Sequence, residues 1–150
     1  MTIQELVDRL KEISLAHKQI KSYHVGNTWD MAASKSSDIY PAVWVEFPVL
    51  VTYEHKNQKK YTFSLDVLTL PKPDNTIDEM DKISDCERIA DQLLQAYMKK
   101  MAGINVGTMS GLTVKALNAD IACGVRVDLE FYTNRECDYE EYFNEEMERL

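Results

Sequence analysis

The sequence has few of the residues that would indicate a disulfide framework or a phosphate-binding loop, and no long apolar run. Its 150 residues include three cysteines, five glycines and four prolines. Cys86, Cys123 and Cys137 are odd in number and widely spaced, which favours neither disulfides nor a zinc site and is typical of a reducing compartment. No apolar run approaches the ~20 residues needed to cross a bilayer. The first residues, MTIQELVDRLKEI, do not resemble a signal or transit peptide. We therefore expect no membrane partner.

Basic residues are also in short supply. The formal net charge is −8, from 25 Asp and Glu against 17 Lys and Arg. Such a chain is a poor electrostatic match for a phosphate backbone, so nucleic-acid binding is not expected as its main activity. The residues from Arg135 to Leu150 contribute −5 of this charge, with seven acids against two arginines. We expect them to form an acidic tail.

Motifs for catalysis, metals or cofactors are missing as well. The three histidines, His17, His24 and His55, lie in no known nucleophile motif. The predicted catalytic, cofactor-binding and metal-ligating residues are therefore none. One enzyme alternative stays open, a dispersed site built from His24, Asp30 and Asp38.

The cysteines and histidines are interpreted as structural. Cys123 alternates with apolar residues and should point into the core, where cysteine behaves as a small hydrophobe. Cys86 and Cys137 are expected to be free surface thiols. His17 should be a packed boundary residue, and His55 a solvated strand end.

Two stretches have the apolar spacing of amphipathic helices. Thr2 to Glu5 is a capping-box pattern, and the periodic apolar residues behind it predict a helix over residues 3 to 21. Thr76 to Glu79 repeats the capping-box spacing and predicts a second helix over about 77 to 101.

The strands are predicted as two hairpins. AVWVEFPVLVTYEH, which follows Pro41, forms one strand or two broken at Pro48, and the run from Tyr61 to Val67 alternates after a polar turn. The second hairpin pairs the run from Leu112 to Ala116 with that from Ile121 to Phe131.

The fold class that follows is α+β. The order is helix, two or three strands, helix and two strands, in short α-β-β-α-β-β, followed by the acidic tail. The sheet should be antiparallel or mixed, with about four to five strands and two long helices on one face. We expect one domain over residues 1–134 and a tail over 135–150. The open edges of such a sheet need protection, and docking onto another subunit is one way to provide it.

Candidate interaction residues lie in three segments and on one strand. Residues 23 to 38, which include Trp29, should be a long and partly extended connection, and GINVGTMSG around Gly103, Gly107 and Gly111 should be a mobile loop. Trp44 should lie on the sheet face opposite Val43 and Val45, covered by its own chain or by another. In the tail, Tyr139, Tyr142 and Phe143 stand among acids and suggest docking onto this subunit or a neighbour.

The layout of the chain resembles the tail-terminator and tail-completion family of tailed bacteriophages. The residues that carry the resemblance are Trp29-Asp30, Asp38 to Glu46, Tyr61 to Pro71 with Asp74, Asp120 to Glu130, and Tyr142-Phe143. The likeness covers most of residues 1 to 143 and is closest to versions in phages of gut Bacteroidetes, including crAss-like phages. These motifs are not a diagnostic signature, and the likeness lies in the order of the segments along the chain.

The resemblance implies a structural virion protein without enzymatic activity. It would form a cyclic homo-oligomer, six- or twelve-fold by family analogy, between the portal or connector and the rest of the tail. Its partners would be itself and the neighbouring portal, connector and tail ring proteins, with DNA only passing through the lumen. The location would be the virion neck or tail, and the host cytoplasm during assembly. The alternative is a small cytoplasmic adaptor domain unrelated to virions.

Overall fold

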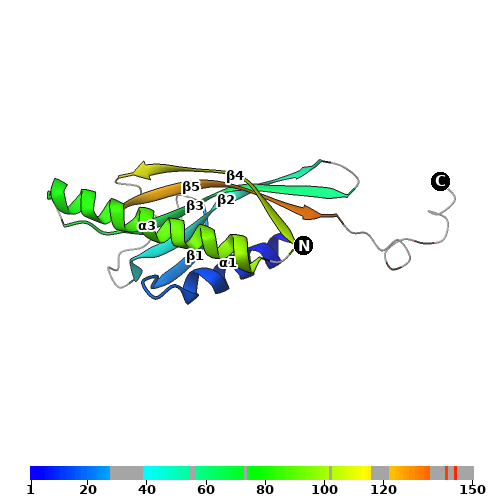
Figure 1. Ribbon diagram of the computed structural model, residues 1–150, viewed down its shortest axis with the longest axis horizontal. Helices are drawn as coiled ribbons and strands as arrows, with labels where there is room; N and C mark the ends of the chain where they lie inside the picture. Colours follow the sequence, from blue (N-terminus) through cyan, green and yellow to red (C-terminus); the bar gives the residue numbers. More distant parts are fainter. Residues whose placement is uncertain are drawn as a thin grey trace.

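Along the chain, one helix precedes the first three described strands and the other follows them. A computed structural model describes residues 1–27, 39–54, 57–72, 74–101, 103–115 and 122–135, together with Glu141 and Asn144. The described elements follow in the order α1, β1, β2, β3, α3, β4 and β5 (Figure 1). In these ranges, neither helix is long and apolar enough to cross a membrane.

Helix α1 spans Ile3–Ala16 and begins as the capping box predicts. The Thr2 side chain accepts from the Glu5 backbone N–H, and the Glu5 carboxylate accepts from the Thr2 backbone N–H. The helix is five residues shorter than the 3 to 21 expected from periodicity. It ends because His17, its C-cap, adopts an extended conformation. Ile20 is still buried, but it reaches the core from the turn after the helix.

Helix α3 spans Thr76–Lys100, close to the predicted 77 to 101. Its cap is Asn75, whose side chain accepts from the Asp78 backbone N–H at 3.0 Å, so the Thr76 capping box is not the one used. Acidic residues in the first turn and lysines in the last turn complement the helix dipole. The helix buries Ile83, Ile89 and Leu93 against the sheet.

The sheet is mixed and has five strands in the order β1-β2-β3-β5-β4. Strands β2 (Ala42–Tyr53) and β3 (Gln58–Thr69) form the first predicted hairpin, with a register shift between Glu46 and Leu50 around Pro48. Strand β5 (Cys123–Asn134) pairs antiparallel with β3 and with β4. The α+β class with two helices and a mixed sheet is therefore confirmed.

One strand lies where a connection was expected. Strand β1 (Ser22–Gly26) pairs in parallel with Ala42–Glu46, at the start of the predicted segment 23 to 38. It escaped prediction because it is short and ends in glycine. The observed order is α-β-β-β-α-β-β, one strand more than the predicted α-β-β-α-β-β.

The prediction of a mobile loop around Gly103, Gly107 and Gly111 is wrong. Residues Ile104–Val114 form strand β4, which pairs with β5 over almost its whole length. Gly107 lies at a register shift, where a Cβ atom would stand 2.7 Å from the Tyr132 ring. The glycine therefore makes room for a neighbouring aromatic side chain inside a regular strand.

The main core lies between the sheet and the two helices, which cover the same face (Figure 1). Val43, Val45, Leu65, Val127 and Phe131 pack against α1 and α3 from alternate strand positions. A smaller cluster forms on the helix-free face, from Tyr40, Ala42, Trp44, Leu68 and Ala122. The β2–β3 hairpin and the end of β5 extend past the helices (Figure 1).

Two cysteines lie inside the fold. Cys123 is fully buried on β5, as predicted, but the expectation of a surface thiol at Cys86 is wrong. Cys86 faces the core from α3, and burial raises its pKa to about 12. Burial likewise raises the pKa of Cys123 to about 11. Both thiols are therefore poor nucleophiles at neutral pH.

Candidate functional site

The predicted interaction residues that the structure describes do not converge on one place. Gly103 precedes β4, and Gly107 and Gly111 lie on it. Trp44 lies on β2, away from them. Trp29, Tyr139, Tyr142 and Phe143 fall outside the described residues, as do Asp30, Asp38, His55 and Cys137.

Trp44 is covered by its own chain. It lies on the helix-free face, opposite Val43 and Val45 as expected, and is only 5% exposed. The His24 ring stacks on it with centroids 4.5 Å apart, and Tyr40 and Leu68 pack around it. Its side chain is therefore part of the second cluster and presents no surface to a partner.

His24 has a structural environment in the described part of the chain. Its ring stacks on Trp44, and its Nε2 atom lies 2.9 Å from the Ser22 hydroxyl. Burial lowers the pKa of His24, which favours the neutral ring. A stacked neutral ring held in this way serves as packing for β1 against β2.

Replacing His24 by alanine should lower the stability of the fold by at least about 1 kcal/mol, because a stacked ring pair contributes about that much in addition to the area that it buries. The free energy of unfolding from urea titrations at pH 8 measures it. Ser22→Ala keeps the stack and removes the hydroxyl that bonds His24 and donates to the Ile39 carbonyl at 2.6 Å, so it measures the hydrogen bonds separately from the stack. A variant that is unchanged in stability but has lost a measurable hydrolytic activity would instead support the dispersed enzyme site.

A polar cluster crosses the middle of the helix-free face. Arg126 donates from Nε to Asp66 Oδ1 at 3.1 Å and from a terminal nitrogen to Glu46 Oε1 at 2.8 Å. Beside it, the Ser64 hydroxyl donates to Asp128 at 2.6 Å. Three carboxylates therefore share one guanidinium and one hydroxyl on β2, β3 and β5, and a shallow hollow of about 530 Å³ lies against them.

Asp66 is the most buried charged group described. It has no exposed surface, and its Oδ2 atom makes no hydrogen bond in the described structure. Burial is the main cause that raises the pKa of Asp66, to about 7, and repulsion from Glu46 is the second. Arg126 opposes the rise. Among the described residues, no three His, Cys, Asp or Glu side chains are placed so that they could hold a metal ion. We interpret the polar cluster as a structural ion-pair network.

The least protected surface of the described fold is an edge of the sheet. Strand β4 is the last strand on its side, and its outer edge makes no strand pair within the described ranges. We call this the β4 edge, Ile104–Val114. Its sequence INVGTMSGLTV has no charged residue and no proline, and Leu112 is 65% exposed. Natural proteins protect free edges with charges or proline, so an unprotected edge is suited to pairing with another strand.

A second unprotected edge lies on the opposite side of the sheet. Strand β1 pairs only with Ala42–Glu46, so the far half of β2 has no outer neighbour among the described residues. We call this the β2 arm edge, Val49–Tyr53. Its sequence VLVTY is uncharged, and Leu50 and Tyr53 are 60% and 65% exposed. It belongs to the hairpin that extends past the helices (Figure 1).

Sequence reasoning anticipated open sheet edges but did not locate them. The signal was present: in a chain with 28% charged residues, these two runs have none. Uncharged strands are ordinarily central, however, and only the strand order shows that these two are at the edges.

Comparison with known proteins adds no relative. A scan against protein-family models finds no match to this chain, and a search of curated proteins finds none either.

Proposed function

We propose that this chain is a structural assembly subunit, in which the β4 edge of one copy pairs with the β2 arm edge of the next. The observation that carries the proposal is the pair of unprotected, uncharged edges on opposite sides of one sheet. A contact between two different patches on two copies is a head-to-tail interface. Repeated head-to-tail contacts produce a closed ring or a filament.

The strand directions support this pairing. Strands β2 and β5 run the same way, and β4 runs opposite to both. Two copies in the same orientation would therefore place β4 antiparallel to the next β2, the more stable pairing. The two edges also lie at matching positions along the strand direction. The register places Ile104, Thr133, Lys59 and Tyr53 in one row across the sheet. The β4 edge begins at the level where the β2 arm edge ends.

The particular assembly that we propose is a ring in the neck or tail of a tailed phage, with the portal or connector and other tail rings as neighbours. The resemblance in sequence layout supports this choice. The acidic helix-free face is also suited to a DNA channel, since Glu46, Asp128 and Glu130 outnumber Lys60 and Arg126 there. A face of this sign would let DNA pass without binding it.

The test is the oligomeric state of two edge variants. Leu112→Lys places a charge on the β4 edge, and Leu50→Lys places one on the β2 arm edge. Each should raise the dissociation constant at least tenfold, because a buried unpaired lysine costs more than 1.4 kcal/mol. Light scattering after gel filtration should show multiples of 17.3 kDa for the wild type and monomers for each variant. Ile77→Lys, at an exposed position of α3, is the control and should leave the assembly intact.

Mixing the two variants tests the head-to-tail arrangement. A Leu112→Lys copy retains its β2 arm edge, and a Leu50→Lys copy retains its β4 edge. An equimolar mixture should therefore form dimers and no rings in electron micrographs. Pairing of β4 with β4 would give dimers of Leu50→Lys alone, and this result would contradict the proposal. A wild-type protein that stays monomeric over a wide concentration range would favour the adaptor alternative.

A further inference from the structure

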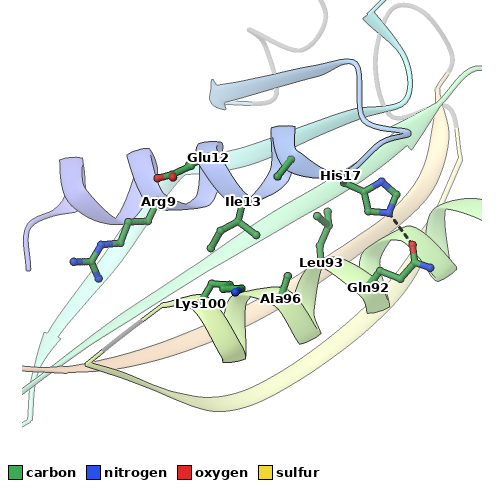
Figure 2. Close-up of a pocket in the computed structure, with 9 residues that line it drawn as sticks. Arg9, Glu12, Ile13, His17, Gln92, Leu93, Ala96 and Lys100 are labelled. Atoms are coloured by element: carbon green, nitrogen blue, oxygen red, sulfur yellow. Dashed lines mark hydrogen bonds between the residues drawn. The ribbon is translucent and has the colours of Figure 1, made fainter.

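We propose that the groove between α1 and α3 binds the C-terminal segment of the same chain, residues 136–150. Self-association through the sheet edges does not enter this inference. The groove lies between the two helices (Figure 2), whereas both strand edges belong to the sheet (Figure 1).

The groove has an apolar floor between charged ends. It encloses about 550 Å³, and its floor is made by Ile13 and Ala16 from α1 and by Leu93 and Ala96 from α3. The helices are held together beneath it by a buried 2.6 Å hydrogen bond between the side chains of Ser14 and Tyr97. The two alanines leave the floor open, so the groove has room for aromatic side chains.

The polar groups at its ends give the groove a direction. Arg9 and Lys100 lie at one end, with Glu12 beside Arg9 (Figure 2). At the other end His17 Nε2 lies 2.7 Å from Gln92 Oε1, which joins the two helices (Figure 2). Cationic side chains thus stand at one end of the groove, and a hydrogen bond between the two helices stands at the other.

The sequence of the C-terminal segment complements these features. Tyr139, Phe143, Met147 and Leu150 recur at intervals of three and four residues, and Tyr142 follows Tyr139 by three, which would put them on one face of a helix. Seven acids stand among them, against Arg135 and Arg149, and would meet the arginine and lysine at one end of the groove. Helix-in-groove recognition uses this combination of apolar anchors and charged flanks.

Strand β5, which precedes the segment, ends near the Lys100 end of the groove. Thr133 on β5 pairs with Ile104 on β4, and the Ile104 backbone N–H donates to the Met101 carbonyl at 3.4 Å. Lys100 is the next residue along α3. The chain therefore leaves the sheet near this end, and the four residues 135–138 can span about 13 Å.

The groove is long enough for about two thirds of such a segment, and the covalent link favours the chain's own groove. The groove follows α1 from Arg9 to His17, about 12 Å of helix, and a helix of residues 139–150 would be about 18 Å long. A short tether raises the effective concentration of the segment to the millimolar range. A modest intrinsic affinity is then enough for binding within one chain.

Disulfide trapping in the full chain tests the proposal. Ala96→Cys would place a thiol on the groove floor and Phe143→Cys one on the apolar face of the segment, in a Cys137→Ser background. The remaining thiols, Cys86 and Cys123, are buried and should not compete. Mild oxidation should give a disulfide within one chain, detected as a faster-migrating band of monomer size. The matched control replaces Ala96→Cys by Asp81→Cys, at an exposed position of α3 outside the groove.

The groove pair should form its disulfide at least tenfold faster than the control pair. Equal rates, or a cross-linked dimer as the main product, would overturn the proposal. The experiment is repeated with Leu112→Lys added. This variant is expected to be monomeric, so the disulfide result does not depend on whether the wild-type protein forms rings. In a second measurement, Phe143→Ser in the otherwise wild-type chain should shift the amide NMR signals of Ala16 and Ala96. Unchanged signals at both alanines would also overturn the proposal.

Discussion

Replacing Gly124 by alanine should destabilise the fold by at least about 3 kcal/mol, because the new methyl group has no space. A Cβ atom at this position would lie 1.9 Å from the Val67 carbonyl oxygen and 3.1 Å from the Leu68 Cα atom. All of these contacts are backbone atoms of β3 and cannot rotate away. The free energy of unfolding from urea titration, followed by circular dichroism, measures the loss.

Gly111→Ala is the matched control on the neighbouring strand. A Cβ atom there would lie 3.5 Å from a Val125 methyl group, which is an ordinary van der Waals contact. Its stability should stay within about 1 kcal/mol of the wild type, since alanine loses less backbone entropy than glycine on folding. If the two variants were equally mild, β5 could not approach β3 as closely at Gly124 as the structure shows.

Replacing Arg126 by methionine should cost about 3 kcal/mol at pH 8, because it leaves Asp66 buried without its cation. Methionine keeps most of the apolar stem of the side chain and removes both charged hydrogen bonds. Urea unfolding of wild type and variant, at matched ionic strength, gives the difference.

The cost of this substitution should depend on pH. The pKa of Asp66 in the folded protein is raised to about 7, above the ~4 of an unfolded chain. Burying Asp66 in its neutral form therefore contributes to the free energy of unfolding. This contribution is fully present below about pH 4 and is lost as pH rises through 7. Without Arg126 this pKa should rise further, so the difference between variant and wild type should be small at pH 5 and should still be growing between pH 8 and pH 9.

The double variant with Asp66→Asn and Arg126→Met isolates the charge. It should recover more than half of the stability lost at pH 8, and its remaining cost should not change with pH. A single variant whose cost is the same at pH 5 and pH 8 would show that Asp66 is already ionised at pH 5.

Local sequence signals predicted much of the fold. The capping box at Thr2, the apolar period of α3 and the alternation from Tyr61 to Val67 each depend on neighbours along the chain. The position of Trp44 on the second face also followed from alternation alone. These signals are strong because helix and strand periods are properties of short segments.

The candidate site depended on pairings between distant segments. GINVGTMSG reads as a loop by composition, yet it forms a strand because β5 offers it a complete ladder of partners. In the same way, β1 exists because Ala42–Glu46 lies beside it. The unprotected edges, the shared guanidinium of Arg126 and the groove between the helices involve residues that are tens of positions apart.

The sequence by itself determined the class of this protein: an acidic α+β chain with two amphipathic helices, two hairpins and no recognisable catalytic motif. Only the tertiary structure decided which strands became edges, which carboxylate was buried, and where the helices left a groove. The physical reason is that periodicity and capping are local, whereas strand order and burial depend on which distant segments meet. The expected assembly role rests on those edges, and the variants at Leu112 and Leu50 test it.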